Sequence, residues 1–464
     1  MMKKYDAIVV GAGPNGLACA ITLRQAGWSV IVLERSSTPG GGTKTEELTL
    51  PGFHHDVCSA VHPMAVASPF FKTLPLQQYG LKWIHSPAAL AHPFDNGDVA
   101  FLERHSDSIA NNDKSAENFQ FILNEILQPV LHVPRHPWRL ARYGLQAIQS
   151  ARAFAYRLKS EKDRALFLGM AAHSPASLEG RTSSAVALTL QMAGETVGWP
   201  IVEGGSSRIS QALVDYFKSL GGEIEMSFEV THLDQLAAIS TDNTQLFFDL
   251  TPRQIFKFAS HKLSRRMRKK FQNFPLGVGV FKIDWALNAP IPWKNLGCAR
   301  AATIHLGGSS EEILESEFRI KRGEHSEKPF VILCQPTLFD PSRAPTGKHI
   351  AWAYCHVPNG STADMTNSIE NQIERFAPGF RETILARSRL FAKDFESRNP
   401  NMIGGDIFGG APDKLIFRPQ FSFHPYALDG KRLWICSSST PPGPAVHGMC
   451  GYNAARAALA LKNN

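Results

Sequence analysis

A glycine-rich loop at residues 11–16 has the GxGxxG spacing of loops that bind the diphosphate of a dinucleotide. In such a loop Gly11 permits the turn out of a strand, Gly13 lets the backbone approach the diphosphate, and Gly16 lets a helix pack close to the sheet. Free N–H groups and the positive end of the helix dipole then stabilise the phosphate charge. The residues expected to bind the cofactor here are Gly11, Gly13, Pro14, Asn15 and Gly16.

The elements around this loop form a complete β-α-β unit. The apolar run 5–10 is typical of a buried parallel strand, residues 17–26 have helical spacing, and a second strand is predicted over 28–33. Glu34 ends that strand, at roughly the 20-residue distance from the glycines at which an acid accepts the ribose hydroxyls, and Arg35 lies beside it. A glutamate there argues against a 2′-phosphate, so the unit predicts a nucleotide of the FAD or NAD type and not NADP.

The composition fits a folded protein with two interleaved domains. The chain has 464 residues, of which 43% are hydrophobic and 19% are charged. Its net charge of +8 predicts attraction to anionic surfaces, whereas no basic stripe with interleaved aromatic residues predicts binding to nucleic acid. Seven cysteines without CxxC spacing predict neither a disulfide framework nor a zinc site. We expect no signal peptide, no membrane span and, from the cysteine usage, a reducing compartment, so the predicted location is cytoplasmic, with association to a membrane surface as the open alternative.

A segment at 54–63 is dense in polar chemistry and has three histidines. Their spacing offers no helical i, i+4 pair and no carboxylate triad, so histidines bonded within a loop are favoured over a metal site. Because the segment follows a second glycine cluster, His55, Ser59 and His62 remain candidates to reach a cofactor or substrate.

The second glycine cluster, Gly40-Gly41-Gly42-Thr43, lies just beyond Glu34, where a NAD dehydrogenase would have its next crossover helix. With the β-α-β start and the Pro51-Gly52-Phe53 that follows, it resembles the phytoene desaturase-like FAD-dependent oxidoreductases. That superfamily includes retinol saturases and, further away, amine oxidases. Its closer branch is similar to the pyridine nucleotide-disulphide oxidoreductase domain-containing protein 2 type and bacterial phytoene dehydrogenase-like proteins. The resemblance implies FAD as the cofactor, with its flavin side contacted by Gly40, Gly41, Gly42 and Thr43.

The end of the chain fits the same superfamily. A strand over 432–436 and a turn over 437–443 lead into a helix over 453–462. In this superfamily such a unit places a helix N-terminus at the flavin pyrimidine, where its dipole stabilises negative charge on the reduced ring. The resemblance implies an adenine contact at Val230 and further cofactor contacts at Ser439, Val446, His447, Gly448 and Met449. This chain departs from the glycines of many relatives at Ser437, Ser439, Pro444 and Ala445.

The implied fold is α/β, with a Rossmann-like FAD-binding domain of the glutathione-reductase/amine-oxidase type interleaved with an α+β substrate domain that has an antiparallel sheet. The FAD-binding domain is expected to comprise 1–74, 199–273 and 428–464. The substrate domain is expected to comprise 75–198 and 274–427.

Candidate catalytic residues lie on the predicted strands of the substrate domain. They are Lys282, His305 and His356, although each such residue alone is more often a packed or hydrogen-bonded core group than a catalyst. The stretch 132–159 predicts a basic amphipathic helix that either lies in a lipid interface or packs on its own domain, the second being favoured. Helical, apolar residues over 165–193 are expected to roof the substrate space.

The function that these features predict is hydride transfer between flavin and an apolar, polyene or lipid-like substrate. No second GxGxxG is found with a strand and helix around it, so we expect no stable NAD(P)H site and reoxidation by oxygen or a quinone. One alternative is a flavin-binding or degenerate scaffold that acts through a protein or membrane partner. Another is an amine oxidase, in which Lys282 would bridge through water to the flavin.

Overall fold

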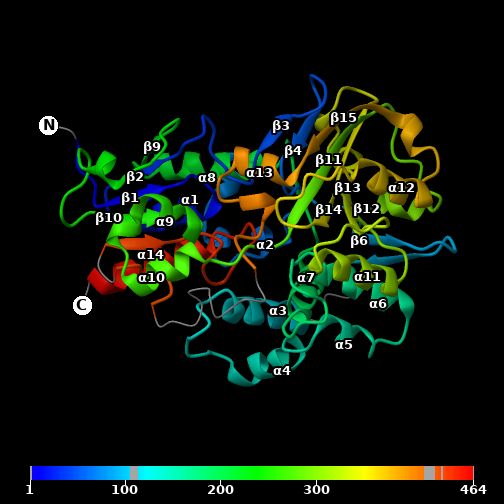
Figure 1. The fold of residues 1–464 in the computed structure, drawn as a ribbon, viewed down its shortest axis with the longest axis horizontal. Helices are drawn as coiled ribbons and strands as arrows, with labels where there is room; N and C mark the ends of the chain where they lie inside the picture. The colour runs from blue at the N-terminus through cyan, green and yellow to red at the C-terminus, as the bar shows by residue number, and fades with distance from the viewer. Residues whose placement is uncertain (1–2, 105–112, 412–423, 430–431, 463–464) are drawn as a thin grey trace.

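The fold is built on two β-sheets that lie side by side in a computed structural model (Figure 1). The structure describes residues 3–104, 113–411, 424–429 and 432–462. The first sheet has five parallel strands in the order β16-β10-β1-β2-β9. These strands are β1 (Ala7–Val10), β2 (Val30–Leu33), β9 (Glu223–Glu225), β10 (Gln245–Phe248) and β16 (Leu433–Ile435). Three distant parts of the chain therefore build one sheet.

Helices cover both faces of this sheet, which explains why β1 and β2 are apolar at every position. Helices α1, α8 and α14 pack on the face that carries Ala7 and Val9. Helices α9 and α10 pack on the face that carries Ile8 and Val10. The bounds of these helices are α1 (Pro14–Gln25), α8 (Ser207–Ser219), α9 (Pro252–Ala259), α10 (Arg265–Gln272) and α14 (Met449–Lys462).

The first and last helices, α1 and α14, lie side by side (Figure 1). A Cβ atom added at Gly451 would lie 1.8 Å from the carbonyl oxygen of Asn15, so the two backbones are in direct contact. No side chain fits at that position. The two ends of the polypeptide therefore meet beside β1.

The second sheet has seven strands in the order β15-β11-β14-β13-β12-β6-β7. Every neighbouring pair is antiparallel except β6 and β12, which are parallel. The strands are β6 (Ala88–Pro93), β7 (Val99–Leu102), β11 (Gly279–Leu287), β12 (Ala301–Leu306), β13 (Val331–Cys334), β14 (His349–Val357) and β15 (Ile384–Leu390). Helix α12 (Thr366–Phe376) packs its apolar residues on Trp285 and neighbouring core residues of this sheet.

A group of helices, α3 to α7, lies below the second sheet in Figure 1. They are α3 (Asp113–Ile126), α4 (Pro137–Ala147), α5 (Ala151–Ala155), α6 (Glu161–Ala171) and α7 (Ser184–Thr196). The prediction of one helix over 132–159 is wrong, because α4 ends at Ala147 and Ser150 caps α5 by accepting a bond from the Ala153 N–H at 3.1 Å. The helical stretch predicted over 165–193 is likewise two helices.

The remaining elements are short. They are β3 (Thr45–Glu47), β4 (His54–Asp56), β5 (Trp83–Ile84), β8 (Ile201–Val202), α2 (Pro63–Ala67), α11 (Ser310–Lys321) and α13 (Ala392–Arg398). Within the described ranges, the helices are all too short or too polar to cross a bilayer. The sheets combine an α/β Rossmann-like unit with a mainly antiparallel one, as predicted, whereas the exact domain limits stay a prediction.

Candidate active site

A single cavity of about 1110 Å³ runs between the two sheets. Its wall contains the glycine loop after β1, the second glycine cluster, the segment before α14, and residues of β11 and β14. Gly13 from the first part of the chain and Val446 from the last both line it. The two chain ends thus share one cavity with the second sheet.

The glycine loop leaves the start of α1 open toward this cavity. Helix α1 begins after Gly13, and neither a capping side chain nor an acid lies in its first turn. A Cβ added at Gly16 would lie 2.0 Å from the Gly11 carbonyl oxygen, so Gly16 closes the turn and packs inward. Gly11, Gly13, Pro14 and Asn15 line the cavity, and the Asn15 Oδ1 atom is buried and without a partner in the described part of the chain. The open start of α1 suits a bound anion, whereas the Asn15 Oδ1 atom accepts hydrogen bonds and suits a hydroxyl or N–H donor.

The second glycine cluster lies directly on the first. The Gly40 N–H donates to the Ala12 carbonyl at 2.9 Å, and a Cβ on Gly41 would lie 3.3 Å from the Gly13 Cα. Gly41 also has a φ of 56°, which side chains disfavour. Gly41, Gly42 and Thr43 line the cavity, whereas Gly40 faces Thr43 and Ser210.

Glu34 is held at the cavity wall by two backbone N–H groups. Its Oε2 atom accepts from Ala12 and its Oε1 atom from Ser36, both at 2.8 Å. Arg35 and Val230 line the same end of the cavity. The carboxylate is therefore fixed at the end of β2, where it can accept hydrogen bonds from the hydroxyl groups of a ribose.

Asp249 is a site residue that the sequence reasoning missed. It follows β10, lines the cavity, and accepts the Gly16 N–H at its Oδ2 atom at 3.0 Å. The pKa of this carboxyl is raised to about 7, chiefly by burial and also by the Glu34 carboxylate, against the opposing effect of the Gly16 bond. Its place directly after a buried parallel strand was a readable signal, because ligands bind at the carboxyl ends of such strands.

The segment before α14 forms the wall at the other end of the glycine loop. Val446 and His447 line the cavity, and burial lowers the pKa of His447 to about 4, which keeps the imidazole neutral. The predicted contacts Ser439, Gly448 and Met449 do not line it. The Ser439 hydroxyl donates to the Gly409 carbonyl at 2.8 Å, and a Cβ on Gly448 would lie 2.6 Å from the Phe71 ring. Ser437 and Ser438 line the cavity instead.

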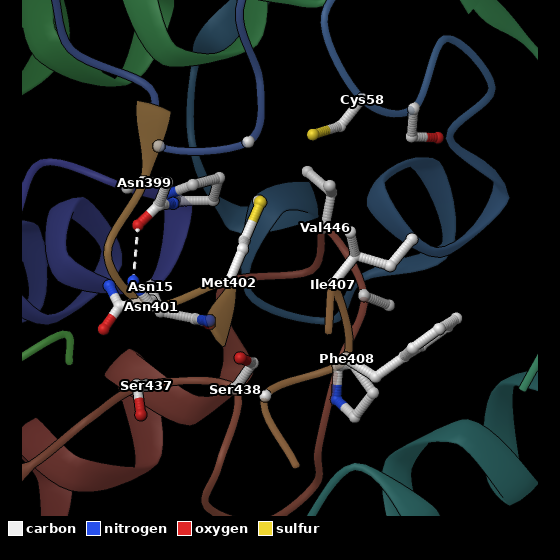
Figure 2. A pocket seen from close by; sticks show the side chains of 18 of the residues that line it. Asn15, Cys58, Asn399, Asn401, Met402, Ile407, Phe408, Ser437, Ser438 and Val446 are labelled. Atoms are coloured by element: carbon white, nitrogen blue, oxygen red, sulfur yellow. Dashed lines mark hydrogen bonds between the residues drawn. The ribbon is translucent and has the colours of Figure 1, made fainter. Parts of the chain in front are cut away.

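A loop after α13 supplies cavity residues that no sequence pattern indicated. Figure 2 shows the side chains of Met402, Cys58 and Val446 gathered around one space, with Asn401 and Asn15 nearby. This loop is tied to the first sheet because the Thr251 N–H donates to the Asn401 side chain at 2.8 Å. The other lining residues of the loop are Asn399, Pro400, Asp406, Ile407, Phe408 and Gly409.

Lys282 is the only one of the three catalytic candidates that lines the cavity. Its ammonium group lies 2.5 Å from both carboxylate oxygens of Asp284, and both side chains are buried. It also lies 5.2 Å from the centre of the Trp352 ring. The ion pair fixes the Lys282 ammonium group at the cavity wall, where Asp284 balances its charge.

The other two candidates are paired behind the wall. The Nε2 atoms of His305 and His173 lie 2.8 Å apart, and the His356 Nδ1 atom lies 2.8 Å from the Glu317 carboxylate. His173, which the sequence reasoning missed, lines the cavity, and burial lowers its pKa to about 3. His173, which follows α6, therefore presents a neutral imidazole to the cavity.

The segment 54–63 divides between the core and the cavity. His62 and Ser59 line the cavity, and the His62 Nε2 atom lies 2.7 Å from the Ser206 hydroxyl. His55 is buried and bonds to the Thr49 hydroxyl at 2.8 Å. Across the described residues, no three histidine, cysteine or acidic side chains come together as metal ligands.

The far end of the cavity is mainly apolar, and the Tyr143 and Thr189 hydroxyls in its wall lie 2.9 Å apart and bond to each other. Its wall comes from α3, α4, α7 and the strands of the second sheet. The lining residues there include Ile126, Leu127, Tyr143, Val186, Leu190, Trp199, Ile332 and Tyr354.

The chain matches a family model over one short segment and known proteins over nearly its whole length. Residues 9–74 match a family model described as an NAD(P)-binding Rossmann-like domain. The chain is 25% identical to pyridine nucleotide-disulfide oxidoreductase domain-containing protein 2 of Rattus norvegicus, over 98% of this chain and 93% of that protein. It is 24% identical to the lycopene-forming phytoene desaturase of Pantoea ananas, over 98% and 99% of the two chains. A solved variant of putrescine oxidase has the same fold, with a TM-score of 0.62, 15% identity and 99% of both chains covered.

Proposed function

We propose that this chain, which is similar along nearly its whole length to phytoene desaturases, binds FAD in the cavity between its sheets and transfers a hydride between the flavin and an apolar substrate. The observation that carries the proposal is the single cavity lined by Gly13, by Val446 and by Lys282. A dinucleotide is long enough to reach from Gly13 to Val446. A substrate beside its flavin ring would face Lys282.

The residues present fit FAD along its whole length. The open start of α1 at Gly13 suits the diphosphate, and the buried, partnerless Asn15 Oδ1 atom suits a hydroxyl or N–H donor of the cofactor next to it. Glu34 suits the adenosine ribose, and Val230 lies at the same end. Gly41 and Gly42 bring backbone without side chains to the cavity wall, next to Cys58 and Met402, where a flat ring would contact them. Asp249 fits only when it is protonated, because its carboxylate would otherwise face the phosphates.

Bound FAD would accept or return a hydride, and the chain's own groups would position the substrate and hold charge. The start of α14, behind Val446 and His447, points a positive helix end toward the ring position. Lys282 is held by Asp284 and cannot swing into solvent. Neutral His173 can donate or accept a hydrogen bond. Because it carries no charge, an apolar molecule that binds beside it does not strip water from an ion.

The substrate class follows from the apolar end of the cavity. Leu127, Val186 and Leu190 offer no hydrogen-bond partner from their side chains, so a polar substrate would lose its bonds to water there. A polyene or lipid-like molecule makes no hydrogen bonds to water, so it loses none when it enters this end of the cavity. Oxygen or a quinone would reoxidise the flavin, because the chain has no second dinucleotide loop for NAD(P)H.

The test is to mix the FAD-loaded protein with carotenoid-type polyenes in the absence of oxygen and follow the flavin colour. The expected result is bleaching by a polyene, or restoration of colour when reduced protein meets an oxidised polyene, with no rapid bleaching by NADH or NADPH. Rapid bleaching by NADH would contradict the proposed acceptor. No response to any apolar compound in either redox state would contradict the substrate class.

Amine oxidation is a second candidate, because a buried lysine and two aromatic rings stand together at the cavity. The rings of Trp352 and Tyr354 lie 6.1 Å apart and nearly parallel, and Lys282 lies against Trp352. Bleaching of the flavin by primary amines, and not by polyenes, would select this candidate.

A further inference from the structure

Two histidines from distant parts of the chain form a pair at the wall of the cavity. The Nε2 atom of His173, which follows α6, lies 2.8 Å from the Nε2 atom of His305 on β12. His173 lines the cavity, whereas His305 lies behind it and is fully buried. The proposed contacts to FAD do not use this pair, so its role must be sought elsewhere in the cavity.

Both imidazole rings of the pair are neutral near pH 7. Burial lowers the pKa of His173 to about 3, and burial also lowers the pKa of His305 well below its usual value. A neutral imidazole carries one proton, on either Nδ1 or Nε2. A hydrogen bond between the two Nε2 atoms therefore needs a proton on one of them and a lone pair on the other.

The packing around His305 decides which ring donates. Its Nδ1 atom is buried and has no partner among the described residues, and a Cβ added at Gly169 of α6 would lie 2.5 Å from it. A proton on this atom would make a buried N–H group without an acceptor, which is rare in proteins. His305 therefore carries its proton on Nε2 and donates it to the Nε2 atom of His173.

The His173 ring must then carry its own proton on Nδ1. No described residue bonds to this atom, and the ring meets the Trp199 ring in a T-shaped contact at 5.4 Å. The Trp199 indole N–H is already used, because it donates to the Leu190 carbonyl at 3.1 Å. The wall thus offers the cavity an N–H donor at His173, among apolar side chains.

The register of the second sheet shows how far this donor lies from Lys282. One row of direct neighbours crosses β12, β13, β14 and β11, and its members are His305, Ile332, Tyr354 and Lys282. Three steps between adjacent strands span about 14 Å. A long substrate that extends along this wall from Lys282 would therefore bring its far end to His173.

We infer that His173 donates a hydrogen bond from Nδ1 to an oxygen atom of an otherwise apolar substrate, and that His305 is the positioning residue that holds the donating tautomer. A carbonyl or ether oxygen fits, because it accepts a hydrogen bond and brings no O–H group that would itself need an acceptor. An oxygen held there would set how far the substrate enters and which of its bonds lies beside Lys282. The substrate class rests on the proposed function, whereas the tautomer of His173 does not.

The test compares two probes on the FAD-loaded protein by isothermal titration calorimetry. They are farnesylacetone, a polyene ketone, and the hydrocarbon in which a methylene group replaces its carbonyl. The ratio of the ketone affinity to the hydrocarbon affinity should fall about tenfold in His173→Phe, because the ketone oxygen loses its donor. The ratio should also fall in His305→Phe and recover in His305→Gln, whose amide N–H can donate to His173. The matched control is His325→Phe, which removes an exposed histidine bonded to the Ser361 hydroxyl outside the cavity and should leave the ratio unchanged.

A second measurement needs no ligand. Proton–nitrogen correlation spectra of protein with isotope-labelled histidine show which ring nitrogen is protonated, and the His173 signals are those that His173→Phe lacks. We expect the proton on Nδ1. A proton on the His173 Nε2 atom, or an affinity ratio that His173→Phe leaves unchanged, would overturn the inference. A ratio that falls only in Tyr354→Phe would overturn it too, by assigning the oxygen to the Tyr354 hydroxyl.

Binding of neither probe would overturn the inferred substrate class. The FAD content of the same sample would then show whether the cofactor part of the proposed function fails as well.

Discussion

Replacing Asp249 with asparagine should stabilise the flavin-free protein at alkaline pH and leave it unchanged in acid. Asparagine keeps the size of the side chain and can still accept the Gly16 N–H through its amide oxygen. The substitution removes only the ability of this side chain to ionise. The change therefore isolates the cost of a carboxylate at the start of α1.

The magnitude follows from the pKa of Asp249, which burial raises from 3.8 to about 7. A carboxyl whose pKa is higher in the folded state binds its proton more tightly there, so folding stability falls as the pH rises between about 4 and 7. A shift of about 3 units corresponds to about 4 kcal/mol at most. Because Asp249 faces the cavity, water screens part of this cost, and we expect a measured gain of about 2 kcal/mol for Asp249→Asn above pH 7.

The assay is urea unfolding of flavin-free protein at about pH 3.5 and pH 8, on either side of the window from 3.8 to about 7, with Asp242→Asn as the control at an exposed aspartate. Titration with FAD over the same range adds a second reading. Affinity of the unchanged protein should fall up to tenfold per pH unit above pH 7, while the variant shows no such slope. A variant that is less stable at both pH values, or that keeps the slope in FAD affinity, would refute the assignment of Asp249.

Three further substitutions test the packing, the ion pair and the substrate end of the cavity. Gly451→Ala should lower the free energy of unfolding by about 3 kcal/mol, because the new methyl group meets the Asn15 carbonyl, whereas Gly144→Ala, which meets no atom within 4 Å, should be neutral or slightly stabilising. Lys282→Met should cost about 3–5 kcal/mol in the same assay by taking the ammonium partner from buried Asp284, which keeps only the His55 Nδ1 contact at 3.4 Å, and Lys282→Met/Asp284→Leu should recover most of that loss. Val186→Trp should weaken binding of an apolar ligand by about tenfold in a fluorescence titration and leave FAD affinity unchanged, and equal losses for both ligands would contradict the division of the cavity.

The parts of the site that sequence alone predicts depend on local physics. The glycine loop, the strand before it and Glu34 lie within a short stretch whose spacing is set by one turn and one helix. Glu34 indeed stands at the end of β2, bonded to the Ala12 N–H. The position of Val446 on the same cavity required the superfamily resemblance, because no local pattern relates the two ends of a chain.

The parts that sequence reasoning missed depend on contacts between distant segments. Asn401 reaches the first sheet by bonding to the backbone of Thr251, which lies 150 residues earlier. His173 becomes a cavity residue only because His305 on β12 holds its ring. Asp249 differs, since its position after a buried strand could have been recognised.

Two predictions about helices and side chains failed for a physical reason. The basic pattern over 132–159 continues across a Ser150 cap, so periodicity alone joined two helices into one. Alternation along a strand shows which residues share a face, but it does not show whether that face meets a cavity or another layer. His356 therefore pairs with Glu317 while Lys282, on the neighbouring strand, reaches the cavity.

The visible absorption spectrum of the purified protein, read with its FAD content, tests most directly whether both chain ends hold one flavin. We predict one FAD per chain, with a spectrum that changes on binding and a melting temperature that rises when FAD is added to stripped protein. A colourless protein whose melting temperature does not respond to excess FAD would contradict the shared site of Gly13 and Val446 and favour a scaffold without flavin.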